Sequence, residues 1–231
     1  MARSTGKNRW VSSVFSSMSP HYDRMHRLLT LGMDGRMRVA AARQLRGGTG
    51  EKLLDLCTGT GAMLLAIRRR RPDLFLTGVD ICDEMIGLAR EKLSSVDRVE
   101  LSHANAEDLP FRDGQFGFVT CAFACPHVSD IRAMLYQAYR VMKKKGKIVL
   151  VDNTRPAGPL ALFFMIYQRL LYPLLAPQAE DRWLYRYLSD SLRYFPHPNK
   201  IKMTMQELGF IRVKYRWLGL GMACVWVGEK E

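Results

Sequence analysis

The chain has 231 residues, of which 48% are hydrophobic and 25% are charged. This mixture is typical of a globular protein rather than a disordered one, and the length allows one substantial core, so we expect a single domain with an insertion. Thirty-five Lys and Arg against 22 Asp and Glu give a net charge of +13, which favours an anionic partner such as a phospholipid surface, a nucleic acid or an acidic substrate.

The five cysteines indicate the cellular compartment. They are odd in number, and no two of them show C-x-x-C spacing, which predicts a reducing cytoplasm and no metal site. No secretory apolar segment follows Met1, because Ser, Thr, Lys and Arg interrupt every apolar stretch before Leu28. We therefore expect a cytoplasmic protein.

Residues 1–46 are expected to form an N-terminal helical arm. Val11, Val14 and Met18 belong to an apolar face with helical spacing, which predicts an amphipathic segment from about residue 11 to residue 30. A second helix is expected over 33–45, because Gly47 and Gly48 form a strong stop signal after it.

Residues 50–152 alternate between strand and helix patterns, and we expect them to form a cofactor-binding core. The strands are expected over 52–56, 74–80, 99–102, 116–122 and 147–152, and the helices over 62–70, 83–93 and 130–142. Strands that alternate with helices of this length predict a parallel sheet with helices on both faces.

A glycine-containing turn follows the first of these strands and opens the next helix. Gly59 and Gly61 permit backbone angles and a close approach that a Cβ forbids, and the free N–H groups of a helix start can donate to a polar ligand. Asp80 ends the second strand, where its carboxylate can accept hydrogen bonds from a ribose diol. The loop predicts a cofactor site, and an ordinary strand-to-helix turn is the alternative.

The segment from Leu160 to Leu174 is the most apolar part of the chain. A spanning helix needs about 20 apolar residues, and Gln168, Arg169 and Pro173 interrupt this one too early. A core helix, a substrate lid and a membrane-surface helix all fit the pattern. We expect a helical lid insertion over 153–208, with further helices at 181–192 and 199–208. Two closing antiparallel strands at 210–217 and 222–227, within 209–231, then follow.

Several separate stretches together resemble one family over nearly the whole chain. The glycine loop lacks the third glycine of the dinucleotide pattern G-x-G-x-x-G and resembles D-x-G-x-G-x-G, motif I of the class I methyltransferases, with Cys57 at the first glycine. Val14 to Asp23 resembles the F-x-x-[VI]-x-x-x-Y-D start of the ubiquinone/menaquinone biosynthesis C-methyltransferases, the UbiE family. Asn105 to Phe111 is similar to its N-A-E-x-L-P-F segment, and Tyr185 to Leu192 to its Y-R-Y-L-x-x-S-I segment.

The resemblance implies an α/β fold: a Rossmann-like class I methyltransferase fold with a mostly parallel seven-stranded sheet, helices on both faces and a helical lid insertion before the last two strands. It also implies that S-adenosylmethionine is the cofactor. Thr60 and its flanking glycines would hold the methionine end, Asp80 the ribose, and Asn105 with Ala106 the adenine. As alternatives, Asp80 could be a helix N-cap and Asn105 a turn residue. The candidate cofactor-binding residues are Asp55, Gly59, Thr60, Gly61, Asp80, Ile81, Asn105 and Ala106.

One segment departs from the family. Where the family typically has S-F-G-L-R-N-V, residues 122–128 read A-F-A-C-P-H-V, so the serine and the arginine are absent and Pro126 cannot replace the arginine's donors. A base that takes the phenolic proton of a reduced quinone raises the nucleophilicity of the ring carbon, and imidazole, with an ordinary pKa of about 6.5, suits that role. His127 is therefore the candidate catalytic residue, and a place in the pocket wall is the alternative.

The resemblance implies S-adenosylmethionine-dependent C-methylation of a prenylated quinol, such as demethylmenaquinol or a ubiquinone precursor, in respiratory quinone biosynthesis. An apolar lid would suit a polyprenyl tail, and a basic surface would suit anionic lipid at the inner face of the membrane. Another phenolic or lipid acceptor, an RNA methyltransferase and a non-catalytic scaffold are the alternatives. We expect no nucleic-acid partner, because no basic-aromatic strip is present, and a homodimer would be similar to family members.

Overall fold

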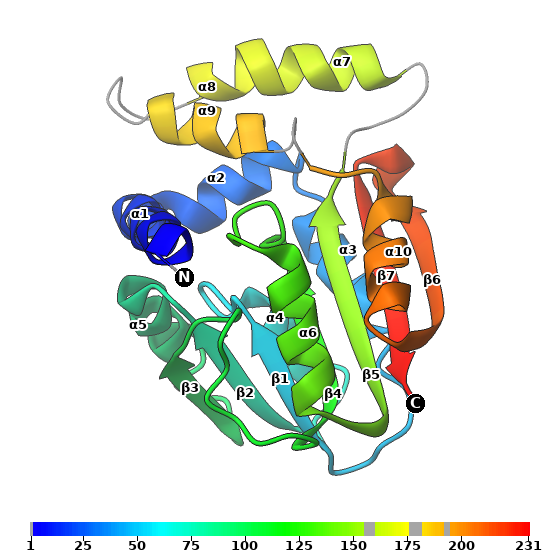
Figure 1. Cartoon of the computed structure of the whole chain (residues 1–231). Helices are drawn as coiled ribbons and strands as arrows, with labels where there is room; N and C mark the ends of the chain where they lie inside the picture. The colour runs from blue at the N-terminus through cyan, green and yellow to red at the C-terminus, as the bar shows by residue number, and fades with distance from the viewer. Residues whose placement is uncertain (1, 155–159, 176–181, 192–194) are drawn as a thin grey trace.

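The structure is a computed structural model that describes residues 2–154, 160–175, 182–191 and 195–231. In this part of the chain one sheet has the strand order β3-β2-β1-β4-β5-β7-β6 (Figure 1). Its strands are β1 (Lys52–Leu56), β2 (Phe75–Asp80), β3 (Val99–His103), β4 (Phe116–Ala122), β5 (Met142–Asn153), β6 (Phe210–Leu218) and β7 (Ala223–Lys230). The first five pair in parallel, and β7 runs antiparallel between β5 and β6. The predicted fold class is confirmed.

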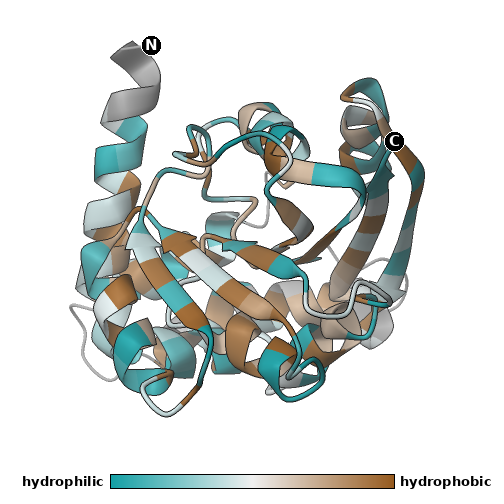
Figure 2. Ribbon diagram, turned by 90° about the horizontal axis from the view of Figure 1, so that it is seen from below, coloured by the Kyte–Doolittle hydropathy of each residue, from teal (hydrophilic) through white to brown (hydrophobic). Residues whose placement is uncertain are grey.

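Helices cover both faces of the sheet, which explains why β4 and the second half of β5 are buried without interruption. One face packs against α6 (Ile131–Val141) and α10 (Pro198–Glu207), and the other against α3 (Asp34–Ala42) and α4 (Ala62–Arg68). The helix α5 (Asp83–Lys92) packs beside β2 and β3. Hydrophobic residues alternate with paler and hydrophilic ones along the strands, and many of the connecting loops are hydrophilic (Figure 2).

The arm and the lid form one cap above the carboxyl ends of the parallel strands (Figure 1). The arm comprises α1 (Ala2–Met18), the 3₁₀ turn η1 (Ser19–His21) and α2 (Tyr22–Leu29); the lid comprises α7 (Leu160–Ile166), the π-helical segment η2 (Tyr167–Leu171), α8 (Tyr172–Leu174) and α9 (Arg182–Ser191). The Tyr167 hydroxyl donates to the Leu28 carbonyl at 2.6 Å, and the Tyr172 hydroxyl donates to the Met25 carbonyl at 3.0 Å. No helix in the described ranges combines the length and hydrophobicity needed to cross a membrane.

Several boundaries differ from the sequence-based predictions, among them three that have a clear physical reason. The arm segment expected over 11–30 is two helices, because the 3₁₀ turn that contains Pro20 separates them. The helix expected over 33–45 ends at Ala42. The fifth strand begins five residues before its expected start, because Met142 already pairs with Phe116 of β4 across an irregular register.

Candidate active site

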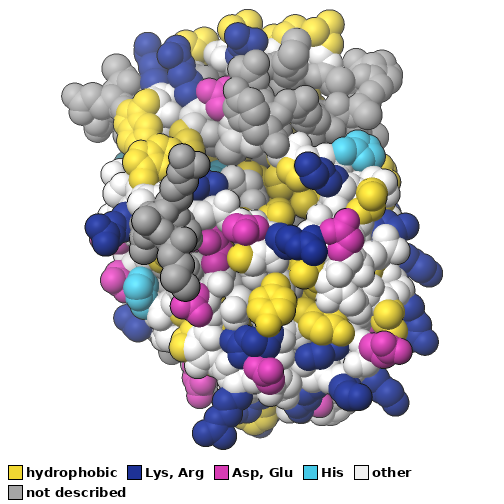
Figure 3. All heavy atoms as spheres, in the orientation of Figure 1, with side chains coloured by type: hydrophobic (Ala, Val, Ile, Leu, Met, Phe, Trp, Pro, Cys, Tyr) yellow, Lys and Arg dark blue, Asp and Glu magenta, His cyan; other side chains and the backbone are white. Residues whose placement is uncertain are grey.

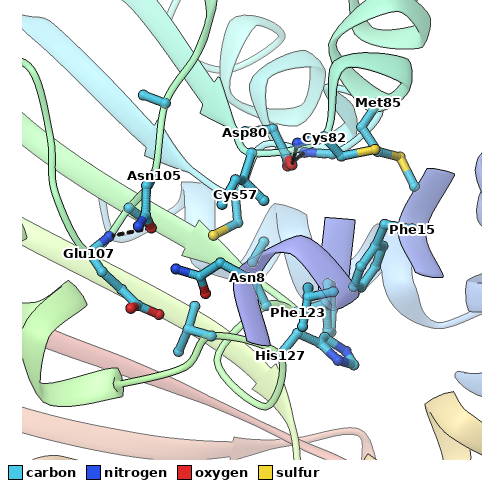
Figure 4. Close-up of a pocket in the computed structure, with 18 of the residues that line it drawn as sticks. Asn8, Phe15, Cys57, Asp80, Cys82, Met85, Asn105, Glu107, Phe123 and His127 are labelled. Carbon is cyan, nitrogen blue, oxygen red and sulfur yellow. Dashed lines mark hydrogen bonds between the residues drawn. The ribbon is translucent and has the colours of Figure 1, made fainter. Parts of the chain in front are cut away.

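A cavity of about 660 Å³, including its mouth, lies at the carboxyl ends of β1, β2 and β4 (Figure 4). In a parallel sheet with helices on both faces, this edge is where ligands bind. The arm contributes Asn8, Val11, Phe15 and Tyr22 to the wall. Among the residues predicted from the sequence, those that line the cavity are Gly59, Asp80, Ile81, Asn105, Ala106 and His127.

Asp55 lies beneath the glycine loop and is 1% exposed. Its carboxylate accepts hydrogen bonds from the hydroxyls of Thr58 at 2.8 Å and Thr120 at 2.6 Å. Burial raises the pKa of Asp55 to about 6, although both hydroxyls counteract that rise. Asp55 therefore ties the loop after β1 to strand β4, and it does not line the large cavity.

Asp80 lies at the edge of the cavity (Figure 4). Both of its carboxylate oxygens accept hydrogen bonds from backbone N–H groups. One oxygen accepts from the Gly59 N–H at 2.8 Å and the other from the Cys82 N–H at 3.0 Å, just before α5. Burial raises its pKa, and these N–H donors oppose the rise. Each carboxylate oxygen can accept more than one hydrogen bond, so the helix-start role and a ribose-binding role are compatible.

Asn105 occupies a tight turn after β3. Its side-chain oxygen accepts from the Glu107 N–H at 2.9 Å, and its carbonyl accepts from the Asp108 N–H at 3.0 Å (Figure 4). The Asn105 side chain therefore shapes this turn, and Asn105 also lines the cavity.

Thr60 and Gly61 are not among the described residues that line the large cavity. The Thr60 hydroxyl donates to Asp23 of the arm at 2.7 Å and accepts from the Lys92 ammonium of α5 at 2.6 Å. Asp23 and Lys92 also form an ion pair. The side chain of Thr60 thus anchors the arm to the glycine loop, and Thr60 lines the smaller cavity described below.

Gly61 has a packing role in this loop. Its φ is +77°, and an added Cβ would lie 2.8 Å from the Leu93 Cδ1 atom. We expect Gly61→Ala to lower the free energy of unfolding by about 1–3 kcal/mol, because left-handed backbone and overpacking both oppose it. Gly87→Ala is the matched control: nothing lies within 4 Å of its added Cβ in the interior of α5, so it should stabilise by about 0.5–1 kcal/mol. Urea denaturation measures both, and equal midpoints would contradict this account.

His127 follows β4 and lines the cavity beneath the arm (Figure 4). Its Nδ1 lies 2.9 Å from the Tyr187 hydroxyl of α9, and its ring packs edge-on against Phe15 of α1, with ring centroids 5.0 Å apart. Burial, together with the nearby charge of Lys7, lowers the pKa of His127 to about 4. The expected pKa near neutrality is therefore wrong, and the ring is neutral at physiological pH.

Arg38 is a candidate that the sequence-based predictions omitted. It is 6% exposed, and its guanidinium pairs with Asp34 and lies 4.8 Å from the centroid of the Phe123 ring. It lines a second cavity of about 280 Å³ that shares Cys57 and Gly59 with the first. The sequence did contain a signal for this residue: Arg38 is a cation on an otherwise apolar helix face, and Asp34, four residues earlier, can pair with it.

Metal ligands are not grouped anywhere in the described residues: no three His, Cys, Asp or Glu side chains are placed to hold one ion.

The model of the ubiE/COQ5 methyltransferase family matches residues 3–230. The chain belongs to this family. It is 34% identical over 228 residues to a demethylmenaquinone methyltransferase of Deinococcus radiodurans. This match covers 97% of this chain and 94% of the relative. It is also 34% identical over 236 residues to the ubiquinone/menaquinone biosynthesis C-methyltransferase UbiE of Geotalea uraniireducens, with 100% of both chains covered.

Solved structures agree on the fold. The crystal structure of a methyltransferase from Thermotoga maritima, described as a possible histamine N-methyltransferase, superposes with a TM-score of 0.71 over 96% of this chain and 100% of that one, at 18% identity. At this identity the match shows the fold alone. Membership of the ubiE/COQ5 methyltransferase family makes the chain an S-adenosylmethionine-dependent methyltransferase, and the methyltransferase interpretation of the sequence is confirmed.

Proposed function

We propose that this family member methylates a ring carbon of a prenylated quinol in respiratory quinone biosynthesis. The observation that carries the proposal is a cavity in which the glycine loop and Asp80 form one wall, and the apolar residues of the arm cover the rest. The names of the full-length relatives, demethylmenaquinone methyltransferase and UbiE, support a quinol as the acceptor.

The residues present fit S-adenosylmethionine. Asp80 would accept hydrogen bonds from the ribose hydroxyls, Ile81 would contact the adenosine, and the turn at Asn105 and Ala106 would border the adenine. The methionine end would lie along Gly59 toward the second cavity, where Arg38 would face its carboxylate. The bound cofactor supplies an electrophilic methyl group on a sulfonium.

The acceptor would occupy the arm side of the cavity, between Phe15, Phe123 and Val128. These side chains would position a flat ring and exclude water, and such positioning can supply about 7–11 kcal/mol of a two-substrate barrier. The neutral imidazole of His127 would accept the proton of the phenolic hydroxyl, so that electron density rises at the neighbouring ring carbon. The Tyr187 hydroxyl, bonded to Nδ1, would hold the ring in place.

Arg38→Gln tests the assignment of the methionine end. We expect the variant to bind S-adenosylmethionine at least about tenfold more weakly, because a charge-assisted hydrogen bond is lost. Binding of methylthioadenosine, which lacks the carboxylate, should change less than about twofold, since it does not use that hydrogen bond. Calorimetry gives both constants, and an equal loss for both ligands would mean that Arg38 supports the fold and not the carboxylate.

The exposed side chains of the lid support the proposal that the protein contacts a membrane surface. Leu162, Phe163, Ile166, Leu170 and Leu174 are 43–66% exposed. Hydrophobic side chains gather along the top of the molecule, with Lys and Arg beside them (Figure 3). Arg169, Arg182 and Arg186 are exposed on the same lid. An apolar face next to arginines suits an anionic lipid surface, which would deliver a long-tailed quinol to the cavity. The homodimer expected from the resemblance stays a prediction.

Replacing Leu162, Phe163 and Ile166 together by serine should reduce binding to phosphatidylglycerol vesicles by at least about tenfold, because apolar area is lost from the membrane contact. Phe164 is left unchanged, since it is 5% exposed and packs in the core. A control replaces Phe75 and Tyr136, which are 46% and 54% exposed away from the lid, and should bind as the wild type does. Sedimentation with vesicles measures binding, and equal loss in both variants would refute a lid-specific contact.

A direct test of the proposed function uses cells that make this protein. Deleting it should remove the methylated quinone and lead to accumulation of the same quinone lacking one ring methyl group, as measured by mass spectrometry of membrane lipids. An unchanged quinone profile would contradict the proposal and favour another phenolic or lipid acceptor.

A further inference from the structure

Three cysteine thiols meet where the glycine loop joins the sheet. Cys57 lines both cavities, and its sulfur points into the large one in Figure 4. Cys121 and Cys125 are buried behind it, 1% and 4% exposed. The Cys121 thiol lies close enough to the thiols of Cys57 and Cys125 to interact with both, and these neighbours, together with burial, raise its pKa well above the usual value. A solvent-side sulfur thus stands in contact with a buried one.

The strand register places Cys57 and Cys121 at a separation that a disulfide can bridge. Cys121 on β4 pairs with Leu56 on β1, and Cys57 is the next residue along the chain. The strand spacing of about 4.8 Å sets the separation of Leu56 and Cys121, and the thiol of Cys57, the next residue, lies within reach of the Cys121 thiol. Disulfides span about 4.4–6.8 Å between Cα atoms.

Cys82, the fourth cysteine near this site, has a carboxylate and not a thiol as its partner. Cys82 also lines the large cavity, but its thiol donates to the Glu84 carboxylate at 3.2 Å, and burial raises the pKa of Cys82 to about 11. Of the cysteines that line the cavity, Cys57 therefore has a second thiol as its partner, and Cys82 has a carboxylate.

We propose that Cys57 and Cys121 form a redox-active dithiol that an oxidised quinone in the acceptor cavity converts to a disulfide. Both S–H bonds break and one S–S bond forms; the two protons and two electrons pass to the two quinone oxygens, which become the hydroxyls of the quinol. The quinone is the two-electron oxidant of this step, which needs no other. The inference rests on the proposed quinone acceptor.

The disulfide would tie the residue that opens the glycine loop to strand β4. Cys57 has a φ of +50° and is followed by Thr58, whose N–H and hydroxyl position the loop on Val79 and Asp55. A covalent bond at Cys57 must move its side chain out of the cavity and shift this loop. The oxidised protein would therefore bind S-adenosylmethionine poorly, and methyl transfer would stop while the quinone pool is oxidised.

The test incubates the reduced protein with a naphthoquinone that carries methyl groups on both quinoid ring carbons, so that addition of a thiol to a free ring carbon is blocked. Peptide mass spectrometry without reductant should find Cys57 joined to Cys121 with the loss of two hydrogens. Binding of S-adenosylmethionine should fall at least about tenfold and return with dithiothreitol.

Cysteine variants show which sulfurs form the disulfide. For each variant, the affinity for S-adenosylmethionine after quinone treatment is compared with that of its own reduced form. Cys57→Ala and Cys121→Ala should keep their cofactor affinity after the quinone treatment, whereas Cys82→Ala should lose it as the wild type does. A Cys121–Cys125 disulfide, or loss of affinity in Cys57→Ala, would overturn the inference. So would a disulfide formed by diamide but not by the quinone. Methyl transfer to a quinol by the reduced protein tests the proposed function separately.

Discussion

Replacing Asp80 with alanine is expected to weaken S-adenosylmethionine binding about 10- to 150-fold, the range of a hydrogen bond to a charged group. Two causes act together. The ribose hydroxyls lose their carboxylate acceptor, and the N–H groups of Gly59 and Cys82 lose the oxygens that fix the loop and the start of α5. Calorimetric titration measures the dissociation constant, and the melting temperature of the variant shows whether it remains folded.

Asp83→Ala is the matched control, because Asp83 is exposed in the first turn of α5 and outside the cavity. Its affinity for the cofactor should equal that of the wild type. Asp80→Asn keeps one carbonyl oxygen and should lie between the wild type and Asp80→Ala. An unchanged dissociation constant in a folded Asp80→Ala variant would remove Asp80 from the cofactor site.

Replacing His127 with asparagine is expected to lower kcat by about 10²-fold while the affinity for S-adenosylmethionine stays unchanged. This is the lower end of the usual contribution of general-base catalysis, because a group whose pKa is lowered to about 4 is a weak base toward a phenol. The loss should shrink as the pH rises, since a phenol ionises without help near pH 10. Turnover within a few fold of the wild type at neutral pH would make His127 a wall residue.

The pH profile of the wild type provides an independent check on His127. Its pKa is lowered, so the imidazole stays neutral and able to accept a proton at every pH above about 5. The rate should therefore show no inflection near pH 6.5 and should fall only as the pH approaches 4. An inflection near 6.5 that disappears in His127→Asn would show that the cavity leaves this ring with an ordinary pKa.

Periodic patterns predicted the sheet well because local chemistry dictates it. The bounds of β1 and β4 match the predictions, since polar or glycine residues precede each apolar run. The strand expected over 147–152 begins earlier, at Met142, so the whole basic run Lys143 to Lys147 lies in β5. Pairing with β4, a segment more than 20 residues earlier, overrides the local signal there.

The candidate site was predicted in part, and the differences come from partners that are distant in sequence. Thr60 turns toward Asp23 and Lys92, which lie 37 and 32 residues away along the chain. The pKa of His127 depends on burial under the arm and the lid, which no local pattern reveals. Arg38 joins the site only because α3 packs beside the glycine loop.

The most direct test of the central claim is methyl transfer by the purified protein from S-adenosylmethionine with a deuterated methyl group to a chemically reduced, demethylated menaquinol. The account predicts that the label appears on the free ring carbon of the quinol, located by NMR and mass spectrometry, and that Asp80→Ala slows the reaction at limiting cofactor. Label on a hydroxyl oxygen, or no transfer by a protein that binds the cofactor, would contradict it.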